Sequence, residues 1–585
     1  MADADKSGLP APSGGFISDA VAEQLDRETA ARWGQIARGL DVRRIALAYV
    51  HWLTHMGMAP GKVAQLSELW FRQYAQLGGF AMRSLLHTEA ARAIEPDPDD
   101  RRFTDAGWRQ LPFSLIEQHY LLRRYWWTQA TANVSGLSDR NENLVRFYTR
   151  LAVDSVSPYN FPLTNPEVWR ATWEANGFNL LRGAGHLVRD IDRYRKGRRP
   201  KSLEDFKVGV NLATTEGKVV YRNRLIELIQ YTPTTARVHP EPVLIVPAWI
   251  MKYYILDLSE GKSMVRYLLD QGHTVFIISW KNPDRTDRDL DMDDYRRLGP
   301  LAALEAVNTR VPERKIHAMG YCVGGTLMAI TAAAMARDGD DRLATLSLLA
   351  AQTDFTEPGE LRLFINDSQL SWLDGLMWKQ GYLDKTKMAG AFKLLRANDL
   401  VWQPLINNYW LGQDQPGIGL MAWNADATRM PYRMHAEYLN RLYLHNQLAD
   451  GQYEVEGRPI ALRDIEVPIF SVGTERDHIA PWRSVYKIEL LAEPRELTFL
   501  LTSGGHNAGI VTPPGHPRRH YRMFTRQRRE HFLSADEWIA RTAPVKGSWW
   551  PAWQNWLKSY SGNKVEPPAI GEALSDAPGT YVFQQ

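Results

Sequence analysis

The segment at 315–335 places one cysteine between glycines where an expected strand meets an expected helix. It contains Gly320-Tyr-Cys322-Val-Gly324-Gly325, and an apolar run follows from Leu327 to Met335. A residue at the tip of such a turn adopts strained backbone angles, and side chains two residues to either side would collide with the turn. The pattern therefore predicts a strand, a tight turn and a helix. It holds the Cys322 thiol at the helix N-terminus, where unpaired N–H groups favour negative charge.

Cys322 is the only cysteine in 585 residues. Free cysteines often serve as small buried core residues, and that interpretation stays open. The flanking glycines favour a nucleophile instead. A single cysteine excludes an internal disulfide and a cysteine metal cluster, and it is typical of a chain kept in a reducing compartment. We expect no metal and no cofactor.

Composition limits the function classes. Lys and Arg number 70 against 67 Asp and Glu, a near balance that argues against a nucleic-acid-binding protein. The N-terminus has no apolar segment of the kind found in secretory signals. No run of about 18 apolar residues is present, so we expect no transmembrane segment and a cytoplasmic protein. The 21 Trp residues are typical of a chain that contacts apolar surfaces or partner subunits.

The chain divides into three expected regions. Residues 1–18 are polar and are expected to form a disordered tail. Residues 19–204 show helical periodicity, as in 43–53 and 113–122, and are expected to form an all-helical N-terminal domain. This region ends in a basic run at 189–201, which is interpreted as a solvated boundary, with phosphate binding as the alternative.

Residues 205–585 alternate between expected strands and helices, which predicts an α/β protein with a doubly wound, largely parallel sheet. The first two strands are expected to form an antiparallel lead-in. A long, mostly helical and aromatic stretch at 355–465 interrupts the alternation and is expected to form a cap over the site. The expected strands are 208–212, 225–231, 243–247, 274–280, 316–320, 345–350, 469–473 and 497–501.

A thiol nucleophile needs a base and an orienting acid. In α/β-hydrolases these residues occur along the chain in the order nucleophile, acid, histidine. Asp477 follows the expected strand 469–473, and His506 follows the expected strand 497–501 in a glycine-rich loop. This order is that of an α/β-hydrolase fold. Glu475 is the alternative acid, and His478 is the alternative base.

The oxyanion of an acyl-transfer intermediate needs two backbone N–H donors. We expect one from Val323, directly after the cysteine, and one from the loop 248–257 that contains Trp249 and Ile250. Asp257 closes this loop. It is interpreted either as a cap for the following helix or as a substrate contact.

Cysteine at this position favours acyl transfer over hydrolysis, because an acyl-cysteine remains a thioester with enough energy to pass its acyl group to an alcohol. A hydrolase of the same fold, such as a thioesterase, is the alternative, and a non-enzymatic scaffold protein is a third possibility. The ordered nucleophile, acid and histidine argue against the scaffold protein.

With these residues in place, the chain resembles the poly(3-hydroxyalkanoate) synthases, particularly those of class I. The matching segments include the cysteine motif and Glu475-Arg-Asp-His-Ile479, and further matches are Lys252-Tyr-Tyr-Ile-Leu-Asp-Leu258, Asn398-Asp-Leu-Val-Trp402, Trp423-Asn-Ala-Asp-Ala-Thr428 and Gly547-Ser-Trp-Trp-Pro551. Two segments depart from the usual pattern: Pro247-Ala248 stands where Pro-Pro is common, and His506-Asn507 where His-Ile is usual.

The resemblance implies polymerisation of (R)-3-hydroxyacyl-CoA, most simply 3-hydroxybutyryl-CoA, with release of CoA and a growing chain held on Cys322. His506 would activate the thiol, and Asp477 would help to activate the 3-hydroxyl of the incoming unit. The family implies a homodimer on granule surfaces in the cytoplasm. Candidates for contact with CoA phosphates are Arg396 and a group at Arg518, Arg519, Arg522, Arg526, Arg528 and Arg529, with solvated surface charge as the alternative.

Overall fold

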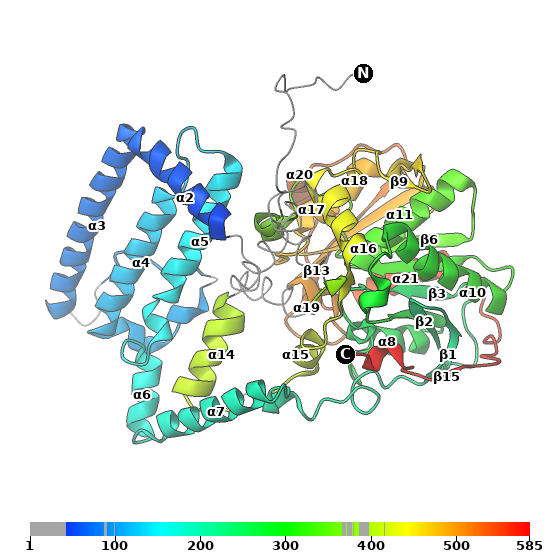
Figure 1. Cartoon of the computed structure of the whole chain (residues 1–585), viewed down its shortest axis with the longest axis horizontal. Coiled ribbons are helices and arrows are strands. Elements are labelled where there is room, and N and C mark those ends of the chain that lie inside the picture. Colours follow the sequence, from blue (N-terminus) through cyan, green and yellow to red (C-terminus); the bar gives the residue numbers. More distant parts are fainter. Residues whose placement is uncertain are drawn as a thin grey trace, which may run out of the picture.

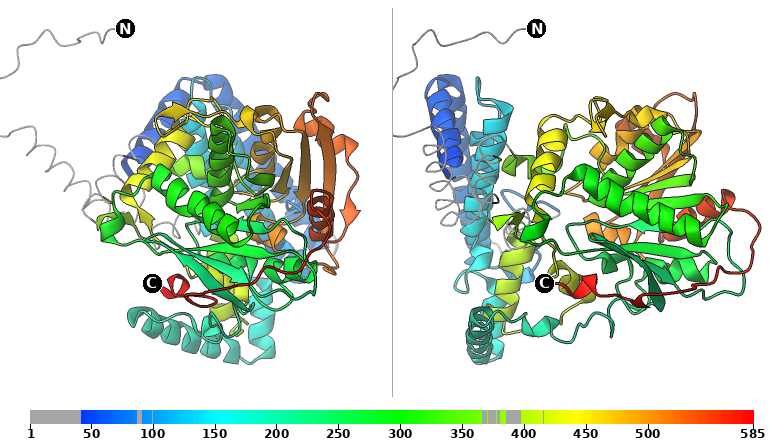
Figure 2. Two further views of the ribbon diagram at one scale, coloured as in Figure 1. Left: turned by 90° about the vertical axis from the view of Figure 1, so that its right-hand side faces the viewer. Right: turned by 45° about the vertical axis from the view of Figure 1, so that its right-hand side comes forward.

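The computed structural model describes residues 42–86, 91–98, 100–365, 370, 377, 380–384, 397–414 and 416–585. The expected tail at 1–18 and the candidate Arg396 lie outside these residues. The described chain forms an N-terminal array of helices beside an α/β unit (Figures 1 and 2). Within it, no helix is both long and apolar enough to cross a lipid bilayer.

The N-terminal region is helical, as its periodicity predicts. Its α-helices are α2 (Val42–Gly57), α3 (Pro60–Leu86), α4 (Phe113–Ala130), α5 (Asp139–Ser155), α6 (Pro166–Glu174) and α7 (Phe178–Arg195). Local signals fix their starts: the Ser138 side chain caps α5, and Asn165 caps α6 directly before a proline. A buried cluster that includes Trp108 and Tyr159 holds the array together. The basic run after Arg189 is mostly exposed, in agreement with a solvated boundary.

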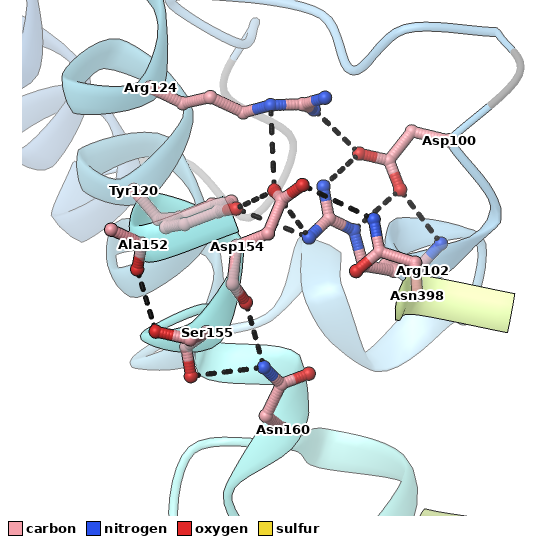
Figure 3. Close-up of polar contacts among 9 residues, drawn as sticks. All are labelled: Asp100, Arg102, Tyr120, Arg124, Ala152, Asp154, Ser155, Asn160 and Asn398. Atoms are coloured by element: carbon pink, nitrogen blue, oxygen red, sulfur yellow. Dashed lines mark hydrogen bonds and ion pairs between the residues drawn. The ribbon is translucent and has the colours of Figure 1, made fainter. Parts of the chain in front are cut away.

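A buried charge network links three segments of this array (Figure 3). Arg102 is 5% exposed and pairs with Asp100 at 2.7 Å and with Asp154 of α5 at 3.0 Å. Tyr120 of α4 donates its hydroxyl to Asp154 at 2.9 Å. Asp154 also accepts a hydrogen bond from Asn398, which lies in the expected cap. Each charge therefore has a partner, as burial of charge requires.

An 11-stranded sheet forms the centre of the α/β unit, in the order β14-β13-β12-β11-β6-β5-β3-β4-β2-β1-β15. Its parallel strands are β3 (Val243–Val246), β4 (Val275–Trp280), β5 (Ile316–Tyr321), β6 (Leu343–Leu349), β11 (Ile469–Thr474) and β12 (Glu496–Thr502). Antiparallel strands flank them: β1 (Gly217–Arg222), β2 (Ile226–Tyr231) and β15 (Ser575–Asp576) on one side, β13 (His520–Gln527) and β14 (Val545–Lys546) on the other. The α/β fold and the parallel strands are confirmed, because parallel strands covered on both faces read as continuous apolar runs.

One expectation about strands was wrong, and one long strand was not expected. Residues 208–212 form a turn closed by a single bridge between Val208 and Leu212, and Gly209 takes a positive φ of 80°. The lead-in strand is β1 instead, five residues further along the chain. Strand β13 was not expected, because its sequence is rich in arginine and its side chains are only partly buried.

The segment between β6 and β11 is largely helical where it is described, and it also contains two small two-stranded sheets that were not expected. The π-helix η9 (Asn398–Trp402), α14 (Gln403–Leu405) and the π-helix η10 (Ile406–Trp410) follow one another and lie against α7 and the N-terminal array (Figure 1). The approach is close: a Cβ atom at Gly183 of α7 would lie 1.8 Å from the Tyr409 carbonyl oxygen. The later part, with α15 (Gly419–Asn424), α16 (Tyr432–Glu437) and the π-helix η11 (Tyr438–Leu444), packs on the α/β core.

Candidate active site

Cys322 sits at a sharp turn between β5 and α11 (Val323–Asp338), with φ 54° and ψ −129°. Such angles are rare for a residue with a side chain and mark a strained position. The neighbouring glycines are sterically required: a Cβ at Gly320 would lie 2.4 Å from the Gly325 Cα, and a Cβ at Gly324 would lie 2.4 Å from the Pro247 carbonyl oxygen. The thiol is 9% exposed and stands at the N-terminus of an apolar helix.

His506 and Asp477 meet beside this turn. The His506 Nδ1 lies 2.7 Å from Asp477 Oδ2. The carboxylate is itself fixed, because Thr474 donates its hydroxyl to Oδ2 at 2.9 Å and two backbone N–H groups, those of residues 479 and 480, donate to Oδ1. The Cys322 sulfur lies close enough to the imidazole to contribute to the raised pKa of His506. The structure thus brings the three residues together in the order thiol, imidazole, carboxylate.

The charges of this trio support one another. Burial opposes a charge on His506, but the Asp477 carboxylate and the Cys322 sulfur outweigh it, so the pKa of His506 lies well above its ordinary value. Burial also opposes a charge on Asp477, and the charge of His506 with the hydrogen bonds holds the pKa of Asp477 below its ordinary value. A proton that leaves the Cys322 thiol is therefore stabilised on the His506 imidazole, beside the Asp477 carboxylate.

The alternative acid and base point elsewhere. Glu475 Oε1 lies 2.9 Å from His520 Nε2 on β13, and His478 is exposed at the surface. Neither Glu475 nor His478 is hydrogen-bonded to His506, whose carboxylate partner is Asp477. The geometry therefore favours Asp477 and His506 over both.

The helix that begins at His506, α19 (His506–Ile510), is anchored from behind. Trp549 donates its indole N–H to the Gly509 carbonyl at 3.0 Å, and Trp550 donates to the Ile510 carbonyl at 2.9 Å. Both tryptophans are buried and belong to the Gly547–Pro551 motif. This C-terminal motif therefore supports the histidine loop from a distant part of the sequence.

The expected oxyanion loop lies next to the cysteine turn, as the contact between Gly324 and Pro247 shows. Thr428 holds it in place by donating its hydroxyl to the Trp249 carbonyl at 2.6 Å and its N–H to the Ile250 carbonyl at 3.1 Å. Trp249 is buried and packs edge-on against Tyr295 and Tyr438. The N–H of Val323, the first residue of α11, directly follows the thiol.

Asp257 is enclosed in the protein rather than open to a substrate. It is 2% exposed and accepts hydroxyl hydrogen bonds from Thr215 at 2.5 Å and Ser263 at 2.7 Å. Ser263, not Asp257, caps the following helix α8 (Met264–Asp270). The expectation that Asp257 caps this helix is therefore wrong in detail, because the aspartate orients the capping serine instead.

Two tyrosines near the thiol were missed by the sequence analysis. Tyr438 and Tyr443 of η11 pack on each other with ring centroids 5.5 Å apart. Burial raises the pKa values of both hydroxyls, and both lie close enough to Cys322 for the sulfur to add to this effect. Phe355 packs on Tyr443 with ring centroids 4.8 Å apart. Both tyrosines are far from Cys322 in the sequence, so no local motif predicts this contact. The only indication is that residues 355–465 are rich in aromatic residues.

Three of the six arginines of the β13 region bind buried groups of the protein itself. Arg526 pairs with Glu489 at 2.6 Å, Arg519 donates to the Ser503 carbonyl at 3.1 Å, and Arg522 donates to the Thr542 carbonyl. Arg518, Arg528 and Arg529 are exposed. For the first three, a structural role fits better than contact with a CoA phosphate.

The fold and this site define an α/β-hydrolase-fold protein whose turn carries cysteine. Residues 241–513 match the family profile described as alpha/beta hydrolase fold. Residues 99–268 match that of the Poly-beta-hydroxybutyrate polymerase (PhaC) N-terminus, and residues 20–62 match that of the Poly-beta-hydroxybutyrate polymerase N terminal.

Full-length relatives agree with the profiles. The Poly(3-hydroxyalkanoate) polymerase of Methylorubrum extorquens is 39% identical over 531 residues, covering 89% of this chain and 87% of that protein. The Poly(3-hydroxyalkanoate) polymerase subunit PhaC of Cupriavidus necator is 34% identical, covering 91% and 90% respectively. The chain belongs to the poly(3-hydroxyalkanoate) polymerase family. The expectation of an acyltransferase of this family is confirmed.

Proposed function

We propose that this polymerase joins (R)-3-hydroxyacyl-CoA units of short chain length, most simply 3-hydroxybutyryl-CoA, through an acyl thioester on Cys322. What supports the proposal is the trio of Cys322, His506 and Asp477 in a chain of this family, with Cys322 as the one cysteine. Val323 and the loop at Trp249 and Ile250 would supply N–H groups to the oxyanion. The assignment to class I remains part of this proposal.

Acylation begins when His506 accepts the thiol proton and the sulfur attacks the thioester carbonyl of the substrate. The tetrahedral oxyanion collapses, the bond from carbon to the CoA sulfur breaks, and His506 returns the proton to the departing CoA thiolate. Elongation forms an ester: a 3-hydroxyl oxygen attacks an acyl thioester, the carbon–sulfur bond breaks, and the hydroxyl proton passes through His506 to the released thiolate. We propose that Asp477 assists the removal of this hydroxyl proton.

Crowded aromatic side chains support the preference for short units. Tyr438 and Tyr443 are buried near the thiol. Phe355 packs on Tyr443 with ring centroids 4.8 Å apart, and Trp249 packs on Tyr438 with centroids 5.7 Å apart. A long alkyl side chain on the substrate would have to displace one of these rings. Release of CoA from 3-hydroxybutyryl-CoA should therefore exceed that from 3-hydroxyoctanoyl-CoA. Equal kcat/KM for both would contradict the length preference.

The competing function is hydrolysis by a thioesterase or polyester depolymerase of the same fold. Purified protein incubated with 3-hydroxybutyryl-CoA separates the two, because polymerisation yields CoA with polyester and hydrolysis yields CoA with free 3-hydroxybutyrate. We expect polyester as the main product. Free acid in the same amount as the CoA would favour hydrolysis.

A rapid-quench measurement of the first acyl transfer separates the roles of His506 and Asp477. His506→Ala should block acylation of Cys322, because the thiol loses its base. Asp477→Asn should be acylated once and then elongate poorly. Equal loss of the first acylation in both variants would leave Asp477 as an orienting residue only.

We propose a helical N-terminal domain at 19–204 and a catalytic domain at 205–585 with a cap at 355–465. We further propose a homodimer associated with polyester granules in the cytoplasm. Exposed apolar side chains on α2 and α3 support the granule contact, including Phe71 at 68% and Leu85 at 74% exposure. A Phe71→Glu/Leu85→Glu variant should sediment less with granules while it releases CoA normally, and unchanged sedimentation would contradict the assignment of this surface.

A further inference from the structure

The strand that carries the thiol and the helix that carries the histidine are joined by one side-chain hydrogen bond. Tyr321, the last residue of β5, donates its hydroxyl to Asn507 Oδ1 at 2.6 Å. Asn507 directly follows His506, just as Tyr321 directly precedes Cys322. The pair therefore links the two neighbours of the reacting side chains.

The Tyr321 ring also packs beneath the base. Its centroid lies 5.7 Å from that of the His506 ring, with 32° between the planes. Tyr321 is 1% exposed, and its hydroxyl donates its hydrogen bond to Asn507 rather than to a substrate. Burial, with the negative charges of Cys322 and Asp477 nearby, holds the pKa of Tyr321 well above its ordinary value. The hydroxyl therefore stays a donor at every working pH.

Asn507 suits this contact because its amide oxygen accepts a hydrogen bond, which an apolar side chain at the same position could not do. The tyrosine hydroxyl and the amide oxygen satisfy each other, so no unpaired hydroxyl, which would be costly, is left on the buried Tyr321.

We propose that Tyr321 and Asn507 are positioning residues that hold the His506 ring at a fixed place relative to Cys322 during acyl transfer. This inference rests on the proposed roles of Cys322 and His506. Asp477 fixes the imidazole at Nδ1, and the Tyr321–Asn507 bond fixes the loop and the ring face on the other side. Small displacements of a catalytic base are expensive, since about 1 Å costs on the order of 100-fold in rate.

Alkylation of the thiol by iodoacetamide, followed across pH, tests the pair. Cys322 is the only cysteine of the chain, so labelling reports on this site alone. The variants are Tyr321→Phe, Asn507→Leu and the double variant, with His506→Ala as the reference for loss of the base. Tyr486→Phe is the matched control, because it removes another buried tyrosine hydroxyl, bonded to the Leu533 carbonyl at 2.8 Å.

Tyr321→Phe and Asn507→Leu should each slow alkylation at pH 7 about fivefold, the effect of one net hydrogen bond, and move the pH profile toward higher pH. The double variant should be no slower than Asn507→Leu alone, because both changes break the same bond. Steady-state CoA release should fall through kcat with KM unchanged. Tyr486→Phe should keep the wild-type profile.

Two results overturn the proposal in distinguishable ways. If His506→Ala changes the profile but Tyr321→Phe and Asn507→Leu only lower the melting temperature, the pair is structural and the proposed function stands. If His506→Ala itself alkylates like the wild-type protein, His506 is not the base, and the proposed function falls together with the positioning role.

Discussion

Acidification should destabilise the α/β unit through two buried histidines, His317 on β5 and His273, which precedes β4. His273 is 0% exposed and His317 is 1% exposed. Burial is the main reason that their pKa values fall from 6.5 to about 4 for His273 and about 3 for His317. The charges of His239 and Lys564 lower the pKa of His273 further, while its bond to Gln554 opposes the shift.

The sign follows from proton binding. Below pH 6.5 these two histidines bind protons in the unfolded chain but not in the folded chain. The stability that they contribute above pH 6.5 is therefore lost as the pH falls toward their folded pKa values. With folded values of about 4 and about 3, each histidine removes roughly 2 kcal/mol between pH 7 and pH 5, and the pair removes roughly 4 kcal/mol.

Urea unfolding followed by tryptophan fluorescence at pH 7 and pH 5 measures this loss. His317→Gln keeps a polar group toward Ser561, which lies 3.0 Å from Nε2, but cannot titrate. Its loss between the two pH values should be smaller than that of the wild-type protein by about 2 kcal/mol. His478→Gln at an exposed position should behave as wild type. A His317→Gln variant that loses as much stability as wild type would refute the reasoning.

Two further predictions concern a close backbone contact and a buried ion pair. Gly324→Ala places a Cβ 2.4 Å from the Pro247 carbonyl oxygen and should abolish CoA release. Gly185→Ala on α7, where nothing lies within 4 Å of the added Cβ, should keep full activity. An active Gly324→Ala protein would show that the turn tolerates a side chain. Asp154→Ala removes a buried ion-pair partner of Arg102, so it should lower the free energy of unfolding by about 3–5 kcal/mol and speed amide hydrogen exchange at 397–411. Asp192→Ala, at an exposed ion pair, should lower it by less than about 0.5 kcal/mol. Unchanged exchange at 397–411 would argue against the link through Asn398.

The parts of the fold that the sequence predicts correctly depend on local signals. Short, largely apolar segments mark β3, β5 and β11, because every residue of these strands is buried. The turn at Cys322 is marked by glycines that its own geometry requires. Asp477 and His506 each follow a predicted strand, in the order expected of an α/β-hydrolase. The sequence therefore predicts that they lie near Cys322, and the structure shows the contact between them.

The remaining features depend on contacts between distant segments. The arginine-rich β13 is a strand because it pairs with β12, although its own residues suggest a charged surface. Tyr443 is 121 positions from Cys322, and Asn507 is 186 positions from Tyr321, so neither contact leaves a local pattern. The docking of residues 398–410 on α7 likewise relies on a close approach at Gly183 that no periodicity reveals.

The central claim is that Cys322 carries the acyl group. The most direct test is the mass of the intact protein, with peptide mapping, after acid quenching of a reaction with one equivalent of (R)-3-hydroxybutyryl-CoA. We predict one 3-hydroxybutyryl group on the peptide that contains Cys322, removable by hydroxylamine, and no adduct on Cys322→Ala. An adduct at another residue, or CoA release by folded Cys322→Ala within about tenfold of the wild-type rate, would contradict the account.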